Sequence, residues 1–272
     1  MRIPTRRLLG LLAALVLVSC GGDHKDSNKP DPDTPFPYAK PSLETMQMDL
    51  HDLGSGQSPT SAAGGCHALS TLAVAWINLN VVLRLAVPMS AFAACLNSQP
   101  VYLGDDTWRW TATGGQGADA ATGELEAHVV SQTQIDWSVR VSGTQESYDR
   151  FLWFAGSCDP SALSGVWHYY DPASRTTPRE VIRCTWSQGS MPGAPRQIEF
   201  ENAEQGAADL GDVLSYEVVE YTASIMLVDA SDADTAWVSW NTITGEGRTE
   251  TPHAGTCCWG SRDLGYPDVT CP

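Results

Sequence analysis

The sequence has few basic residues and none of the common catalytic motifs. Its 16 lysines and arginines stand against 32 aspartates and glutamates, a formal charge of −16 over 272 residues. We therefore expect no nucleic-acid partner, because nucleic acids bind basic surfaces. Gly-x-Ser-x-Gly, Ser-x-x-Lys and His-Glu-x-x-His are absent, and no two of the six histidines are four residues apart. These absences predict a protein without enzymatic activity or a cofactor.

Acidic residues are numerous, but they lack the spacing of a calcium-binding loop. Asp229, Asp232 and Asp234 lie between two expected strands, and Asp209 and Asp212 lie in another loop. Oxygen-rich loops can bind Ca²⁺. The Asp-x-Asp-x-Asp-Gly ladder and its distal glutamate are missing, however, and aspartate is common in turns. We interpret these residues as turn residues and expect no metal site.

Residues 1–19 have the pattern of a secretory signal peptide. A basic start with Arg2, Arg6 and Arg7 precedes an apolar run over residues 8–18, which is too short for a membrane span. Leu17-Val18-Ser19-Cys20 resembles the lipobox of bacterial lipoproteins. The resemblance implies cleavage before Cys20 and a lipid on its thiol; the alternative is an ordinary signal peptide followed by a coincidental cysteine. Cleavage would leave 13 basic and 32 acidic residues, a charge of −19.

The same resemblance implies a location in the cell envelope. Residue 21 is Gly and not Asp, which by the sorting rule of enteric bacteria favours the outer membrane. Each acyl methylene buried in lipid contributes about 0.8 kcal/mol, so the lipid alone would hold the protein on the membrane. Residues 20–41, which contain five prolines and several charges, predict a disordered tether between the lipid and the domain.

Seven cysteines remain once Cys20 is acylated, and disulfides are expected outside the cytoplasm. The odd number leaves at least one thiol free. Adjacent Cys257 and Cys258 are not expected to bond to each other, because that geometry is strained. We expect one of these two, with Cys258 as the candidate, to bond to Cys271 in the C-terminal loop (251–272). Cys158 and Cys184, which flank two expected strands, form the second candidate pair.

The helical part of the domain is expected over residues 42–97. A short helix is predicted from Ser42 to about Leu53. Residues 68–96 are apolar on every helical face, with Arg84 as the only charge. We interpret this segment as a buried core helix kinked near Pro88. A membrane span is the alternative, although its internal polar residues disfavour insertion in a bilayer.

Residues 107–250 show the two-residue alternation of half-buried strands. Trp108 and Trp110 alternate with Arg109 and Thr111, and the pattern recurs further along the chain. Short turns between these segments predict an antiparallel meander of about nine or ten strands. The expected fold is therefore mostly β (α+β), a single domain over 42–272 in which the meander forms a curved sheet or open barrel around the long apolar helix.

Nine of the ten tryptophans lie in this β region. Aromatic side chains can line a ligand groove or fill the space between a sheet and a helix. The candidates for lining a ligand site are Trp108, Trp110, Trp137, Trp153, Trp167 and Trp240.

Two functions follow from this organisation. The architecture over residues 68–250 is similar to the lipoprotein-carrier half-barrels of bacterial envelopes, which implies an apolar ligand or lipid on the concave face. The alternative is a structural or protein-interaction lipoprotein of the envelope, with the helix filling the core, no ligand, and an envelope protein as its partner.

Overall fold

The computed structural model describes residues 33–50, 53, 65–114, 120–143, 148–174, 177–191, 194–253 and 255–272, without the side chains of 72–84 and 148. Cys20, the signal peptide and the first part of the expected tether lie outside the described residues. The chain forms two compact units. Unit 1 contains residues up to Pro41, 85–162 and 167–180, and unit 2 contains 42–84, 163–166 and 181–272.

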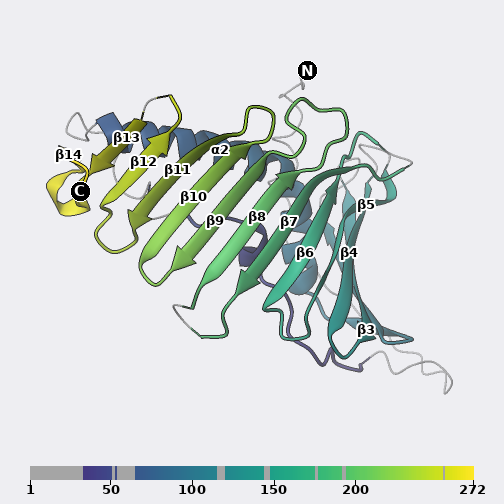
Figure 1. The fold of residues 1–272 in the computed structure, drawn as a ribbon. Helices are drawn as coiled ribbons and strands as arrows, with labels where there is room; N and C mark the ends of the chain where they lie inside the picture. The colour runs from purple at the N-terminus through teal and green to yellow at the C-terminus, as the bar shows by residue number, and fades with distance from the viewer. Residues whose placement is uncertain are drawn as a thin grey trace. The chain divides into compact units, whose positions relative to one another are not determined.

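Fourteen strands form one sheet in which each strand is hydrogen-bonded to the next along the chain (Figure 1). The strands are β1 Val101–Gly104, β2 Thr107–Gly114, β3 Ala121–Ser131, β4 Gln134–Gly143, β5 Tyr148–Cys158, β6 Ser164–Tyr170, β7 Glu180–Gln188, β8 Arg196–Asn202, β9 Val213–Val219, β10 Thr222–Asp229, β11 Asp234–Asn241, β12 Gly247–Thr251, β13 Gly255–Trp259 and β14 Asp268–Val269. The sheet is an antiparallel meander that is not closed, with β1 and β14 at its edges. The predicted mostly β, antiparallel class is confirmed.

The sequence pattern reveals only nine or ten of these strands because several are very short. β1 has four residues, β12 and β13 have five each, and β14 has two. Two-residue alternation needs a longer run to stand out from loop sequence. The segment after residue 250, expected as a loop, contains β13 and β14.

A bulge in β5 explains a run that is apolar at successive positions. Val139 pairs with Phe154 and Arg140 with Leu152, so Trp153 is an extra residue with no partner of its own in β4. The bulge lets both Trp153 and Phe154 face the buried side of the sheet, where they are 8 % and 0 % exposed. Leu152, which pairs with Arg140, lies on the opposite face of the sheet.

Helix α2 covers Gly65–Leu96, with Pro88 inside it. Within unit 1, the Phe92 ring lies 5.7 Å from the ring of Phe154 and 6.0 Å from that of Trp167, edge to face in both cases. Gly123 of β3 gives the helix room: a Cβ atom there would lie 3.4 Å from the thiol of Cys95. No helix among the described residues is long and apolar enough to cross a membrane.

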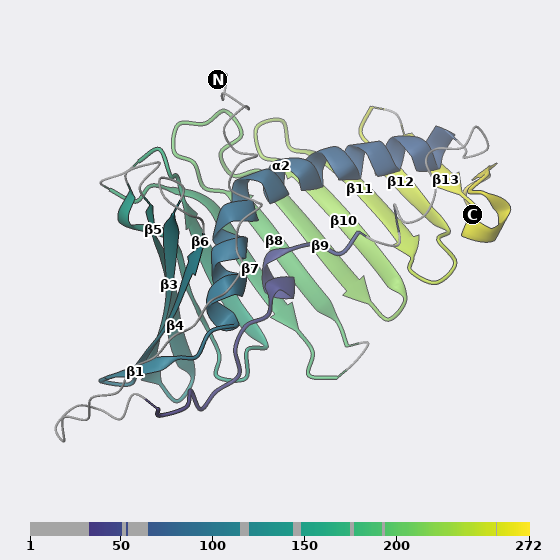
Figure 2. The ribbon, with the colours of Figure 1, turned by 180° about the vertical axis from the view of Figure 1, so that it is seen from behind.

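In unit 2, the first turn of α2 is fixed by the C-terminal part of the chain (Figure 2). The carboxylate of Asp268 accepts the backbone N–H groups of Gly65 and Cys66 at 3.1 and 3.0 Å. The His67 ring stacks on Tyr266 with 3.7 Å between centroids. Burial lowers the pKa of His67, so the ring is neutral at neutral pH.

Residues 42–50, before α2, lie against strands of unit 2 and include a short 3₁₀ helix, η2, over Leu43–Met46. The longer helix predicted from Ser42 does not form. The carbonyl groups of Glu44 and Gln47 accept hydrogen bonds from the Arg196 guanidinium, and that of Asp49 accepts one from the Tyr216 hydroxyl at 2.8 Å. These bonds to β8 and β9 replace the bonds a helix would make.

Two disulfides are present among the described residues. Cys258 bonds to Cys271, as predicted, and Cys66 at the start of α2 bonds to Cys257. The predicted Cys158–Cys184 bond is wrong, since both thiols are free and buried. Strand β6 lies between β5 and β7. The two cysteines therefore do not lie on neighbouring strands, as the predicted bond requires.

Candidate functional site

The six tryptophans proposed to line a ligand site are core residues, with exposed fractions between 0 and 8 %, and one of them, Trp137, also borders a hollow described below. The indole N–H of Trp137 donates to the Cys158 thiol at 3.1 Å, and that of Trp108 donates to the carbonyl of Thr34. Trp167 packs against Phe92 of α2, which has no exposed surface. In unit 1, the face of the sheet toward α2 is therefore occupied by the protein's own side chains.

The end of the expected tether also packs on unit 1. The ring of Phe36 meets those of Trp108, Trp110 and Trp137 edge to face at 5.3 to 5.4 Å. A hollow of about 440 Å³ lies beside it, between residues 33–40 and Trp110.

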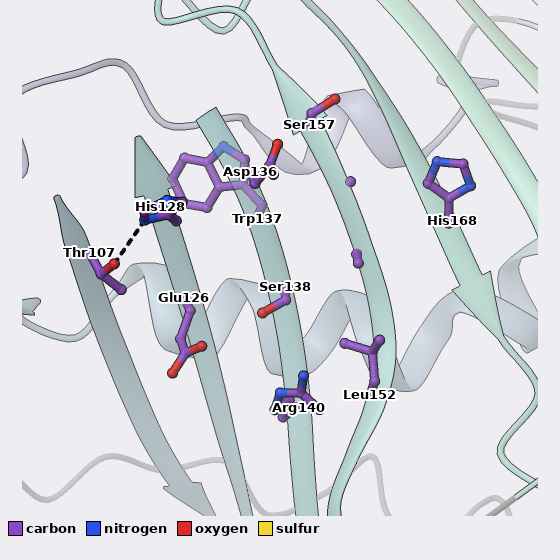
Figure 3. Close-up of a pocket in the computed structure, with 12 residues that line it drawn as sticks. Thr107, Glu126, His128, Asp136, Trp137, Ser138, Arg140, Leu152, Ser157 and His168 are labelled. Carbon is purple, nitrogen blue, oxygen red and sulfur yellow. Dashed lines mark hydrogen bonds between the residues drawn. The ribbon is translucent and has the colours of Figure 1, made fainter. Parts of the chain in front are cut away.

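A second hollow, here called the outer basin, lies on the opposite face of the unit 1 strands and has a volume of about 420 Å³ (Figure 3). Strand alternation creates it: β4 buries Trp137 and Val139 while Ser138 and Arg140 face outward. Small side chains on β4 and β5 form its floor, and longer ones on β2, β3, β4 and β6 surround them. The lining residues are Thr107, Glu126, His128, Asp136, Trp137, Ser138, Arg140, Leu152, Ala155, Gly156, Ser157 and His168.

Charged side chains are concentrated at one end of the outer basin. Arg109 donates to Glu126 through Nε at 2.8 Å, and Arg150 donates to Glu124 at 2.8 Å and lies 3.8 Å from Glu126. Arg140 is the exception, because its hydrogen bond among the described residues is a 3.4 Å contact with the Arg150 carbonyl. Three guanidinium groups and two carboxylates thus meet at this end, while a third carboxylate, that of Asp136, lines the basin farther along β4.

Two histidines lie farther along the outer basin, each held through Nδ1. His128 contacts the hydroxyl of Thr107 at 3.0 Å, and His168 contacts the carboxylate of Glu180 at 2.8 Å. Both rings keep Nε2 for another partner. Across the part of the chain that the structure describes, the hydroxyls of Ser138 and Ser157 have no hydrogen-bond partner.

The groups in the outer basin can bind a ligand through charge and hydrogen bonds. Among the described residues, the hydroxyl that contacts a histidine of the basin is that of Thr107, which lies against His128, and no serine or cysteine contacts either ring. Nor do those residues contain a group of three His, Cys, Asp or Glu side chains able to hold a metal ion.

Asp229 and Asp212, two of the aspartates considered as calcium ligands, form hydrogen bonds within or between their own loops. Asp229 accepts hydrogen bonds from the amide and hydroxyl of Ser231 at 2.9 and 2.7 Å and from the amide of Asp232. These bonds lower the pKa of Asp229. Asp212 accepts the amide of Ala230, which joins the two loops.

Sequence reasoning did not find the outer basin. Its polar residues alternate with buried ones, as they do on any solvated strand face. The available signal was the set of small residues on β4 and β5, with Ser138 opposite Ala155, and Gly156 and Ser157 following on β5. The pairing that brings them together depends on the β5 bulge.

No protein-family model matches the chain, and comparison with the curated proteins and with the solved structures found no match.

Proposed function

We propose that this protein is a lipid-anchored lipoprotein of the bacterial cell envelope that binds through the outer, polar face of its sheet. Its inner face is a filled core and carries no lipid. In this proposal the sheet curves around α2, and Cys20 holds the protein on the outer membrane. The function is that of a binding or interaction module and not of a lipid carrier.

The burial of Phe92 is the observation that supports this choice between the two expected functions. Its ring is 0 % exposed and lies between Phe154 and Trp167. An acyl chain could occupy the space between α2 and the rings of Phe154 and Trp167 only by displacing that ring. Removing a buried phenylalanine from its contacts costs about 3–5 kcal/mol, which the ligand would have to offset before any net affinity appeared.

Native mass spectrometry of the protein purified from envelopes in mild detergent tests both parts of the proposal. We expect the mass of a chain that starts at Cys20 plus its covalent lipid, with no further bound lipid, and no additional lipid on organic extraction. A stoichiometric lipid that leaves only on unfolding would refute the filled core. A chain that retains residues 1–19, or lacks the covalent lipid, would refute the anchor.

A further inference from the structure

We propose that the outer basin binds a small hydroxylated carboxylate, of the class of the acidic sugars. The proposal rests on the proposed function, since it names the ligand class of the outer face. Its two parts, a carboxylate and several hydroxyl groups, follow from different residues of the basin.

Arg140 supplies the evidence for the carboxylate. The other described arginines of unit 1, Arg109, Arg150 and Arg179, each form an ion pair with a carboxylate. Glu124 stands directly opposite Arg140 on β3 but is bonded to Arg150 instead. Arg140 is thus the guanidinium of the outer basin with no carboxylate partner among the described residues. Guanidinium groups bind carboxylates through two parallel hydrogen bonds.

The rest of the lining limits the ligand to one negative charge. Glu126 lines the same end of the basin as Arg140, and Asp136 lines its other end (Figure 3), so a phosphate dianion at Arg140 would be repelled by these carboxylates more strongly than a monoanion would. A ligand that carries a single carboxylate and is otherwise neutral avoids most of this repulsion. Its hydroxyl groups could also donate hydrogen bonds to both acidic side chains.

The neutral groups of the basin suit hydroxyls because a hydroxyl both donates and accepts hydrogen bonds. Ser138 and Ser157 offer hydroxyls, and His128 and His168 offer Nε2 on either side of them (Figure 3). Leu152 adds an apolar surface for the C–H groups of a sugar ring. The volume of about 420 Å³ lies within the roughly 300–1,000 Å³ of small-molecule sites, enough for one or two sugar rings.

Isothermal titration calorimetry of the full mature chain, made soluble by Cys20→Ser, tests the proposal with D-galacturonate and D-glucuronate as probes. We expect at least one of them to bind. D-galactose, acetate and inorganic phosphate should each bind at least about tenfold more weakly, since each lacks the carboxylate, the hydroxyls or the single charge.

The variant Arg140→Gln should weaken hexuronate binding about tenfold or more, while Arg140→Lys keeps the charge and should lose less. The matched control is Arg183→Gln, which removes an arginine paired with Glu201 on a strand of unit 2 and should leave the affinity unchanged. Equal melting temperatures for Arg140→Gln and the parent exclude a folding defect as the cause of weaker binding.

Three results would overturn the proposal: no binding of either hexuronate at millimolar concentration, equal affinity for galactose or phosphate, or hexuronate binding that Arg140→Gln leaves unchanged. None of them would alter the lipid content measured by native mass spectrometry. Failure of the ligand class is therefore distinguishable from failure of the filled core.

Discussion

At the residue scale, the two faces of the unit 1 strands carry side chains of different chemistry. The inner face is made of rings and aliphatic side chains in contact with one another, and Phe92 joins α2 to β5 and β6. The outer face carries arginines, carboxylates, serines and histidines, most of them half-buried. Stability is concentrated on the first face and binding groups on the second, so substitutions on the two should have separate effects.

Phe92→Ala should lower the free energy of unfolding by about 3–5 kcal/mol, because it removes a fully buried ring and leaves a cavity. Urea unfolding followed by tryptophan fluorescence measures the change. Leu69→Ala is the control, since Leu69 lies on the same helix and is 69 % exposed, and it should shift the value by no more than about 0.5 kcal/mol. Similar losses in the two variants would show that Phe92 is not part of a filled core.

At the element scale, cysteines connect segments far apart in sequence while three others stay reduced. Cys66 ties the start of α2 to β13 across 191 residues, and Cys258 ties β13 to Cys271. Cys95, Cys158 and Cys184 are buried and free. Burial raises the pKa of Cys95 and of Cys158 from 9.0 to about 11, and it raises that of Cys184 as well. These thiols are therefore neutral and unreactive at pH 8.

Alkylation with iodoacetamide at pH 8, without reductant, should count three thiols in the Cys20→Ser chain. In the folded protein almost no label is expected, because the thiolate is the reactive form and the pKa values are raised. In urea, where the pKa values return to their ordinary range, intact mass should show three labels. A single label in urea would mean that two of the three cysteines form a third disulfide. Rapid labelling of the folded protein would contradict the burial of the thiols.

The same elements show which parts of the fold could be predicted from sequence. The strands around Trp110, Leu125 and Trp137 were visible because each alternates over a run long enough to see. The bulge at Trp153 places two successive side chains on the buried face, so the sequence did not show which face of β5 each residue lies on. The false Cys158–Cys184 pair arose because the sequence does not show which strands are neighbours in the sheet, and β6 lies between β5 and β7.

At the scale of the whole molecule, strand alternation and short turns correctly indicated an antiparallel β protein, but composition could not locate a site. The acidic excess is an average over the chain, whereas the positive spot at Arg140 depends on which carboxylate bonds to which arginine. Which carboxylate bonds to which arginine depends on the cross-strand neighbours of each residue and on the bulge in β5. The tryptophans attracted attention in the sequence, yet the structure uses them as core and places binding groups on the opposite face.

Amide chemical shifts measured during a titration with D-galacturonate test the central claim most directly, because they locate a bound ligand on one face or the other. The sample is the full mature chain with Cys20→Ser, labelled with ¹⁵N. We predict saturable shifts centred on Ser138, Arg140 and Ser157 of the outer basin, with Phe92 and Cys95 unaffected. Shifts centred on Phe92, Cys95 and the other residues of the inner face would contradict the claim that this protein binds through its outer face.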